Sequence, residues 1–291
     1  MALSNRAKGI ACIVASAFGF AVMAACVRLC DDFGGPVSSF QKSFFRNVVA
    51  LAIAAIVFIR QPKAPIPPQA PIRPSLKEWL LVFLRSALGT VGIFANFYAL
   101  GRIPIAEGQT LNKTAPFFTV IFAWLFLKER AGWRSFLPLL VAFAGVVLIA
   151  KPGFAGNAAL PLALGLLGGL CAGAAYAALH ALGKSSFSPA FVILFFSAFS
   201  CLASVPFMLH EFDPMTAAQV AVLFGAGAGA ALGQFGVTLA YRFAAPRDIA
   251  VFDYSNIVFT AILGFALFAQ IPDAFSLCGF ALILSAAWLM R

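Results

Sequence analysis

Two basic residues, Lys42 and Arg46, lie one helical turn apart inside the apolar segment PVSSFQKSFFRNVVALAIAAIVFI (residues 36–59). Residues four apart share one face of an α-helix, and a cation inside a bilayer costs at least about 2.5–3.5 kcal/mol unless it is paired or hydrated. Two arrangements meet this requirement. The face either lines a water-filled cavity where the cations bind an anionic group of a solute, or it forms a structural ion pair or a clamp on backbone carbonyls.

Two further apolar segments carry clusters of polar side chains. Segment EGQTLNKTAP (107–116) brings Gln109, Asn112 and Lys113 just ahead of a proline, and segment DYSN (253–256) brings a carboxylate, a phenol, a hydroxyl and an amide. Proline lacks the backbone donor of a helix and leaves carbonyls free nearby. Such clusters either line a transport path or hydrogen-bond neighbouring helices.

Single polar residues in other apolar segments complete the set. A lone histidine such as His180, near the end of its segment, is more often structural than a proton relay. Arg85, about eight residues inside its segment, is expected to extend its guanidinium to the cytoplasmic interface. The full set of candidate substrate-binding residues is Lys42, Arg46, Asn96, Tyr98, Gln109, Asn112, Lys113, Tyr176, His180, Gln234, Asp253, Tyr254 and Asn256.

The composition places the chain in a lipid bilayer. The 291 residues are 62% hydrophobic and only 10% charged, whereas a soluble domain is about half apolar and about a quarter charged. The net charge of +10 comes mainly from short connections between apolar runs, without the basic stripe of a nucleic-acid-binding protein. We therefore predict an all-α polytopic membrane protein with no nucleic-acid partner.

Ten apolar segments, each of roughly 18 to 26 residues, are long enough to cross about 30 Å of hydrocarbon as helices. The connections between them are short, except that RQPKAPIPPQAPIRPSL (60–76) is rich in proline and predicts an extended spacer. The predicted spans are residues 8–30, 36–59, 77–100, 104–127, 131–150, 158–182, 188–209, 217–242, 247–270 and 273–290.

The distribution of lysine and arginine predicts the orientation of these spans. Thirteen of the 20 basic residues fall on one side of the membrane and three on the other, while Lys42, Arg46, Arg85 and Lys113 lie within spans. Positive charge marks the cytoplasmic side. Both termini are therefore predicted to be cytoplasmic.

The two halves of the chain, residues 1–152 and 153–291, look related. A shift of 142 residues places Pro104 on Pro246 and aligns two pairs of phenylalanines further along. Each half holds five predicted spans, an odd number, so the halves must have opposite orientations. Such inverted repeats are typical of secondary transporters whose binding site lies near the membrane midplane.

The segment PFFTVIFAWLFLKER (116–130), followed by AFAGVVLIAKP (142–152), resembles the EamA repeat of the bacterial drug/metabolite transporter superfamily. The resemblance covers the whole chain as two copies, the second with Val258 in place of the proline and Ile271 in place of Glu129. It implies ten helices in two inverted EamA repeats around a central cavity in the bacterial inner membrane, and solute transport without ATP. The chain is most similar to the aromatic amino acid exporters, while members with similar signatures carry other amino acids, riboflavin or S-adenosylmethionine.

The charges inside the spans suit a solute with a carboxylate. Four cations face fewer deep acids, chiefly Glu107 and Asp253, and amide and phenol groups lie beside apolar walls. Together with the resemblance, this predicts export of a neutral, aromatic or large apolar amino acid by alternating access. The sequence does not determine the energy source. It also does not determine the oligomeric state, and a monomer is one of the possibilities.

Two other classes of function compete with this interpretation, an intramembrane enzyme and a channel. An enzyme would need an acid or base such as His180, Glu107 or Asp253, yet no catalytic triad, HExxH motif, metal-ligand set or cofactor motif is found. The segment HALGKSS (180–186) has Ala178 where a phosphate-binding loop requires glycine. We therefore predict no catalytic residue, no metal ligand and no cofactor.

The orientation can be tested by cysteine labelling in a cysteine-free variant. Single cysteines at Gln69 and Ser186 should react with a membrane-impermeant reagent only after the cells are opened, because both positions are predicted to be cytoplasmic. Cysteines at Gly156 and Glu211 should react in intact cells. Labelling of position 69 from outside would contradict the predicted orientation.

Overall fold

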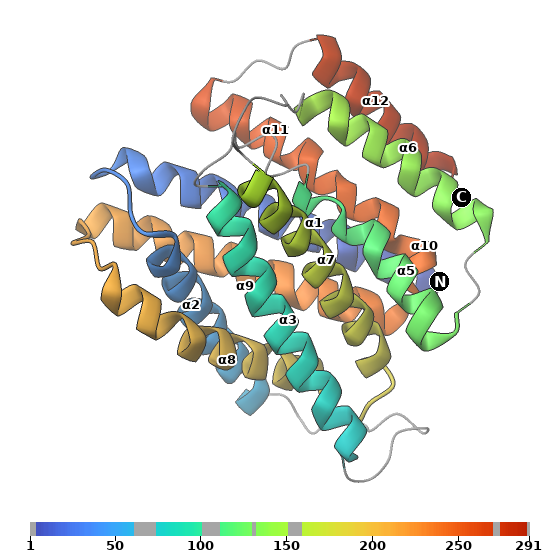
Figure 1. Cartoon of the computed structure of the whole chain (residues 1–291), viewed down its shortest axis with the longest axis horizontal. Helices are drawn as coiled ribbons and strands as arrows, with labels where there is room; N and C mark the ends of the chain where they lie inside the picture. Colours follow the sequence, from blue (N-terminus) through green and yellow to red (C-terminus); the bar gives the residue numbers. More distant parts are fainter. Residues whose placement is uncertain are drawn as a thin grey trace.

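The computed structural model describes residues 4–60, 74–100, 111–129, 132–150, 159–269 and 274–289. Within these ranges the chain forms a bundle of helices without strands (Figure 1). The helices in chain order are α1 (Asn5–Asp32), α2 (Ser39–Arg60), α3 (Leu76–Leu100), α5 (Ala115–Leu127), α6 (Trp133–Ala150), α7 (Ala159–Leu182), α8 (Pro189–His210), α9 (Ala217–Phe243), α10 (Pro246–Ile249), the 3-10 helix η1 (Ala250–Tyr254), α11 (Ser255–Phe268) and α12 (Ala274–Leu289).

The helices have the lengths and composition of membrane spans. Seven stretches of the described residues are long and apolar enough to cross a bilayer, namely α1, α2, α3, α7, α8, α9 and the run from α10 to α11. Three shorter apolar helices, α5, α6 and α12, fall within the remaining predicted spans. The prediction of an α-helical polytopic membrane protein is confirmed, whereas ten spans in two inverted repeats remain a prediction.

Several helices begin at a residue whose side chain caps the first turn. The hydroxyl of Ser4 accepts from the backbone nitrogen of Ala7 at 3.2 Å at the start of α1. At the start of α9, Thr216 and Gln219 form a reciprocal capping box. These bonds satisfy backbone donors that have no partner within the helix, so the polar residues at these sites determine where the spans begin.

Two of the predicted spans are interrupted near their middle. Residues Lys113 and Thr114 form a turn, after which α5 begins with Pro116 in its first turn. In the second half, η1 separates α10 from α11. The predicted span 247–270 is confirmed as the apolar run Pro246–Phe268, but within it the chain tightens into a 3-10 turn just before Ser255. Interrupted helices expose backbone groups in the middle of the bilayer, which proteins tolerate where the backbone is buried or lines a cavity.

Helices of the first half pack along helices of the second. α1 lies along α9, α3 along α7, α2 along α8 and α6 along α12, and Figure 1 shows α6 beside α12 at one edge of the bundle, away from α2 and α8. The ten predicted spans can be numbered in chain order, and each span of the first half can then be exchanged with the span five positions later. This exchange turns the α1–α9 pair into the α7–α3 pair, and it leaves the α2–α8 and α6–α12 pairs unchanged. Two related halves would give this pattern.

Glycines allow α1 and α9 to approach backbone against backbone. A Cβ built on Gly19 would lie 2.7 Å from the carbonyl oxygen of Gly229, and a Cβ built on Gly229 would lie 2.8 Å from that of Gly19. Both separations are shorter than real Cβ contacts. Small residues at such crossings are typical of helix pairs in membranes, where close backbone packing drives association.

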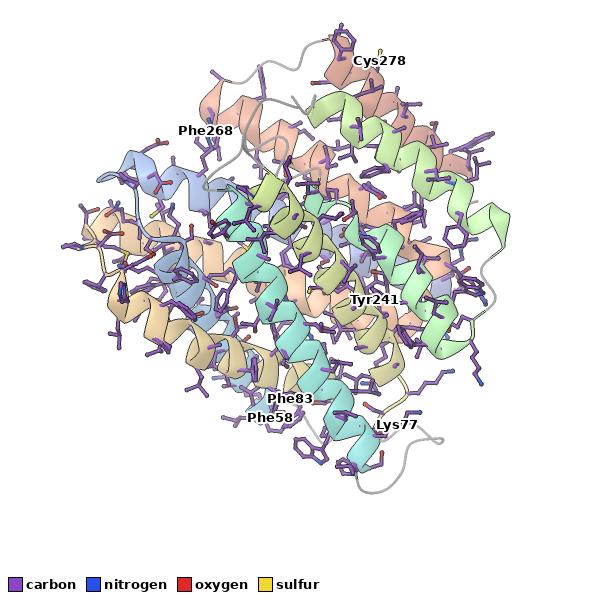
Figure 2. All side chains as sticks on the ribbon, viewed as in Figure 1. Phe58, Lys77, Phe83, Tyr241, Phe268 and Cys278 are labelled. Carbon is purple, nitrogen blue, oxygen red and sulfur yellow. The ribbon has the colours of Figure 1, made fainter. Side chains whose placement is uncertain are left out.

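Large apolar side chains cover the outside of the bundle. Phe83 is 51% exposed and Leu202 is 75% exposed. Figure 2 shows Cys278 at the outer edge on α12 and Tyr241 within the bundle. An exposed apolar surface of this kind is stable in contact with lipid tails. These side chains therefore belong to the outer surface of the bundle and not to the candidate site.

The tight α1–α9 crossing generates a stability prediction. Gly229→Ala should lower the thermal midpoint of the detergent-solubilised protein by several degrees, because overpacking at a rigid contact costs about 1–3 kcal/mol. Gly225→Ala is the matched control on the same helix, since its nearest neighbour is the Cys26 sulfur at 3.4 Å. Equal midpoints for the two variants, measured by intrinsic fluorescence, would contradict the backbone contact.

Candidate functional site

Lys42 has an acidic partner near the end of the bundle that is predicted to face outside. Its Nζ atom lies 2.6 and 2.7 Å from the two carboxylate oxygens of Asp31, close to the end of α1. The Lys42 side chain is 10% exposed and that of Asp31 is 40% exposed. Of the two arrangements predicted for this cation, the structure shows the ion pair.

Arg46 and Arg85 are buried deeper and lack such a partner. Arg46 is 5% exposed and Arg85 is 2% exposed, and the Nε atom of each has no hydrogen-bond partner. Within the described part of the chain, neither guanidinium has a carboxylate within ion-pair distance. An uncompensated intramembrane cation is by default a sign of a functional site.

Arg85 turns into the bundle rather than toward the cytoplasmic interface, which corrects the expectation from the sequence. Its Nη2 atom donates to Oε1 of Gln234 at 2.7 Å, and its guanidinium lies 3.7 Å from the centre of the Phe196 ring. A hydrogen bond and a cation–π contact together favour this inward position. Gly89 leaves the necessary space, because a Cβ there would lie 2.8 Å from Nη1 of Arg85.

Tyr176 on α7 connects the two arginines to the second half of the chain. The charges of Arg46 and Arg85 act on each other and on the Tyr176 hydroxyl, which is also within electrostatic reach of Asp253. The Tyr176 ring lies 5.7 Å from the ring of Tyr241 on α9. The arginines and the carboxylate therefore belong to one electrostatic cluster.

Lys113 and Asp253 meet where the two interrupted spans break. Nζ of Lys113 lies 3.8 Å from Oδ2 of Asp253, and each residue is 8% exposed. Each stands one residue before a helix N-cap, Thr114 for α5 and Tyr254 for α11. These caps are 140 positions apart, close to the shift of 142 residues inferred from the sequence.

The remaining polar residues of the predicted clusters differ in their surroundings. Nδ2 of Asn256 donates to the backbone carbonyl of Ala17 on α1 at 2.8 Å, which is an interhelical bond. Tyr254 is fully buried and its hydroxyl has no hydrogen-bond partner, as is true of Oδ1 of Asn96. Asn112 is partly buried beside Lys113. Unpaired buried polar atoms are costly, so Tyr254 and Asn96 offer hydrogen bonds to a ligand or to water.

A cavity of about 710 Å³ opens between α2, α3 and α8 at the end predicted to face outside. Phe40, Phe94 and Phe207 line it and pack on one another, with ring centres 4.9 to 5.6 Å apart. Tyr98 also lines the cavity. Arg46 lies six residues beyond Phe40, about 9 Å deeper along α2, so the charged cluster is deeper in the membrane than the three rings.

Polar contacts join the two halves at this same end. Nε2 of Gln41 donates to the carbonyl oxygen of Asp213 at 2.8 Å, and the backbone nitrogen of Asp213 donates to Oε1 of Gln41 at 3.0 Å. The backbone nitrogen of Ser38 donates to a carboxylate oxygen of Asp213 at 2.8 Å. The start of α2 is therefore tied to the connection between α8 and α9.

A second group of contacts joins the halves at the end predicted to be cytoplasmic. Nε2 of His180 lies 2.7 Å from Oε1 of Glu129, and its Nδ1 lies 2.8 Å from the backbone carbonyl of Tyr241. Glu78 at the start of α3 accepts from the backbone nitrogen of Ser186 at 3.0 Å. These bonds connect α3 and the end of α5 to helices of the second half.

Six of the thirteen predicted residues lie in the central cluster of the bundle, together with Arg85. Lys42 and Tyr98 lie toward the outer end, His180 lies toward the cytoplasmic end, and Gln109 lies outside the described residues. The central cluster contains Arg46, Arg85, Lys113, Tyr176, Gln234, Asp253 and Tyr254.

Sequence reasoning missed Arg85 and the aromatic ring that holds it. The available signal was the depth of Arg85, about eight residues inside its span, which matches the depth of the cations already selected. The contacts with Phe196 and Gly89 carried no signal, because 33 phenylalanines and 24 glycines are distributed along the chain.

Comparison with known proteins gives a consistent group of relatives. Residues 7–151 match the EamA-like transporter family. The pseudopaline exporter of Pseudomonas aeruginosa is 27% identical, over 98% of this chain and 96% of that protein. The S-adenosylmethionine uptake transporter of Rickettsia bellii is 25% identical over 87% and 84% of the two chains, and the riboflavin transporter of Brucella anthropi is 27% identical over 86% and 87%.

A solved crystal structure shares the fold. Its TM-score against this chain is 0.76 at 17% sequence identity, and the match covers 94% of this chain and 95% of the other. At this identity the likeness concerns the arrangement of the helices alone.

The cytoplasmic contact between Glu129 and His180 generates a stability prediction. His180→Ala should destabilise the protein by about 1–3 kcal/mol, because it leaves the partly buried Glu129 carboxylate without its partner. The chain's other histidine, His210 at the exposed end of α8, is the control, and His210→Ala should leave the thermal midpoint unchanged. A His180→Ala variant as stable as the parent in a thermal melt would show that this contact does not hold the halves together.

Proposed function

The chain belongs to the EamA-like transporter family, and on that premise we propose that it is a secondary transporter whose central site binds a small carboxylate-bearing solute. The relatives are transporters of the drug/metabolite superfamily. In the proposed mechanism the site faces the two sides of the membrane alternately. The protein is embedded in the lipid bilayer, and transport does not use ATP.

The single observation that carries this proposal is the buried cluster around Arg46 and Arg85. Guanidinium groups bind carboxylates with paired hydrogen bonds, and both arginines are buried without an acidic partner among the described residues. Lys113 and Asp253 lie at helix breaks within the same electrostatic cluster. Interrupted helices at the midplane are a recurrent way in which transporters build a solute site.

The arrangement of the halves supports alternating access. We propose that residues 1–152 and 153–291 form two inverted five-span repeats. Two observations support this: helix packing is unchanged when the halves are exchanged, and Lys113 and Asp253 each stand one residue before the N-cap of a helix that follows a break in its span. A site between two such halves can open to either side when one half tilts against the other.

The two ends of the bundle suggest how the site is closed. At the cytoplasmic end, Glu129 contacts His180 and Glu78 contacts Ser186, and each contact joins one half to the other. At the outer end a cavity reaches as far as the three phenylalanine rings. We propose that opening toward the cytoplasm breaks the first group of contacts, and that opening toward the outside separates the rings.

The cargo is proposed to be an amino acid or a closely related small acid. We propose export across the bacterial inner membrane, in keeping with the similarity to the pseudopaline exporter of Pseudomonas aeruginosa. The distribution of lysine and arginine supports a cytoplasmic location of both termini. The sequence favoured a neutral, aromatic or large apolar amino acid. Riboflavin and S-adenosylmethionine, which relatives carry by name, are the competing cargoes.

Transport by purified protein in liposomes tests the proposal. Labelled phenylalanine, tryptophan, methionine, threonine, aspartate and glutamate are offered with and without a pH gradient, and saturable uptake that shows counterflow is expected. Lys113→Ala should reduce the rate at least about tenfold, because it removes a cation of the site and leaves Asp253 unpaired. Lys77→Ala, at the exposed start of α3, is the control.

Three results would contradict the proposal. Ohmic current through the liposomes would indicate a channel, and chemical conversion of a solute in detergent would indicate an enzyme. Saturable transport of riboflavin or S-adenosylmethionine without competition from any amino acid would leave the transporter function intact but refute the cargo.

A further inference from the structure

We propose that the cargo carries two more negative than positive charges, as a small dicarboxylate does, and that Arg46 and Arg85 each bind one of its acidic groups. This inference rests on the proposed function and narrows its cargo from any carboxylate-bearing solute to an acidic one. It departs from the neutral amino acid that the sequence alone favoured.

Two buried cations have no acidic partner among the described residues. Lys113 pairs with Asp253, whereas the guanidinium groups of Arg46 and Arg85 have no carboxylate within ion-pair distance. Lys42, the other cation of these spans, is neutralised by Asp31 and takes no part in the cluster. Among the described residues, these two guanidinium charges are therefore uncompensated inside the membrane, where such a charge is costly.

Asp253 is already engaged. Its carboxylate lies 3.8 Å from Lys113, and both side chains are 11% exposed. A neutral amino acid would bring one carboxylate and one ammonium group, so its ammonium would compete with Lys113 for Asp253 and the excess charge would remain. A cargo with two unpaired acidic groups would remove the excess without disturbing this pair.

The two arginines keep free hydrogen-bond donors. The Nε atom of each is buried without a partner, and Nε together with one terminal nitrogen is a usual bidentate face toward a carboxylate. The groups that now hold Arg85 are neutral, the amide of Gln234 and the ring of Phe196. They position the guanidinium but do not neutralise it, which leaves its charge available to a ligand.

The interrupted spans add to the preference for anions. The turn at Lys113 and Thr114 places the start of α5 in the cluster, and no side chain caps α5 or α11. The N-terminus of a helix carries a partial positive charge. Two such termini beside three cations make the region electropositive beyond the formal count.

A series of ligands with one carbon skeleton and different charge tests the proposal. Glutarate, L-glutamate and L-glutamine have net charges of about minus two, minus one and zero at neutral pH. Binding to the full chain in lipid nanodiscs is measured by calorimetry at constant ionic strength, and uptake of the same three labelled compounds is measured in liposomes with the membrane potential clamped. We expect affinity to fall about tenfold at each step from glutarate to glutamine.

Charge variants separate a binding role from a structural one. Arg85→Gln should reverse the preference, so that L-glutamate binds more tightly than glutarate, while Lys77→Gln on the same helix should leave the series unchanged. Asp253→Asn raises the excess to three positive charges and should tighten glutarate binding. A purely structural role of Asp253 would weaken binding instead, so this second variant keeps the test decisive if Arg85→Gln does not fold.

Each outcome has a defined consequence. If glutamine or phenylalanine binds as tightly as glutarate, the charge proposal is overturned and an amino acid transporter remains. Failure of all three probes to bind at millimolar concentration would also overturn the charge proposal. Absence of saturable uptake of every labelled solute, the neutral amino acids included, would overturn the proposed function itself.

Discussion

The cost of placing a cation in hydrocarbon is the constraint on which the centre of this protein depends. Lys42 meets it through Asp31, and Lys113 meets it through Asp253. Arg85 meets it only in part, through an amide and an aromatic ring, and Arg46 has no carboxylate among the described residues. The outer faces of the surrounding helices are apolar and contact the lipid tails, which cannot solvate a charge. Water or an anionic solute must do so.

In the proposed inverted repeat, Lys113 and Asp253 stand at corresponding positions of the two halves. If the two halves were identical, as in a symmetric pair of short chains, the residues at these positions would carry the same charge and repel each other. A single chain with two diverged halves permits a cation in one half and a carboxylate in the other. In the proposed repeat the same divergence accounts for the arginines, since positions that correspond to Arg46 and Arg85 need not be basic. The central site is therefore asymmetric although the packing of the helices around it is symmetric.

Much of the fold could be predicted from the sequence, because apolar run length directly determines where helices cross a bilayer. The span limits agree with the described helices within a few residues, except that the first part of the predicted span 104–127 lies outside the described residues and α5 begins only at Ala115. The break before Ser255 could not be foreseen, since residues 250–254 contain no proline or glycine, and the neighbours of η1, chiefly α1 and α5, are known only from the structure. The inward turn of Arg85 was also missed. A cation near a span end reaches the interface in most proteins, and only the positions of Phe196, Gln234 and Gly89 reveal that this one does not.

The contacts between the halves differ in kind along the axis of the bundle, and this difference determines how the halves can move. At the two ends the halves are joined by side-chain bonds such as those of Glu129 with His180 and of Gln41 with Asp213, and water can replace such bonds when they break. Gly19 and Gly229 instead place backbone against backbone, and separating them would open a gap that no side chain can fill. A tilt that preserves the glycine crossing while exchanging the contacts at the ends thus costs the least. In the proposed transport cycle, such a motion exposes the charged cluster to one side at a time, so that a charged solute crosses the membrane without a continuous pore.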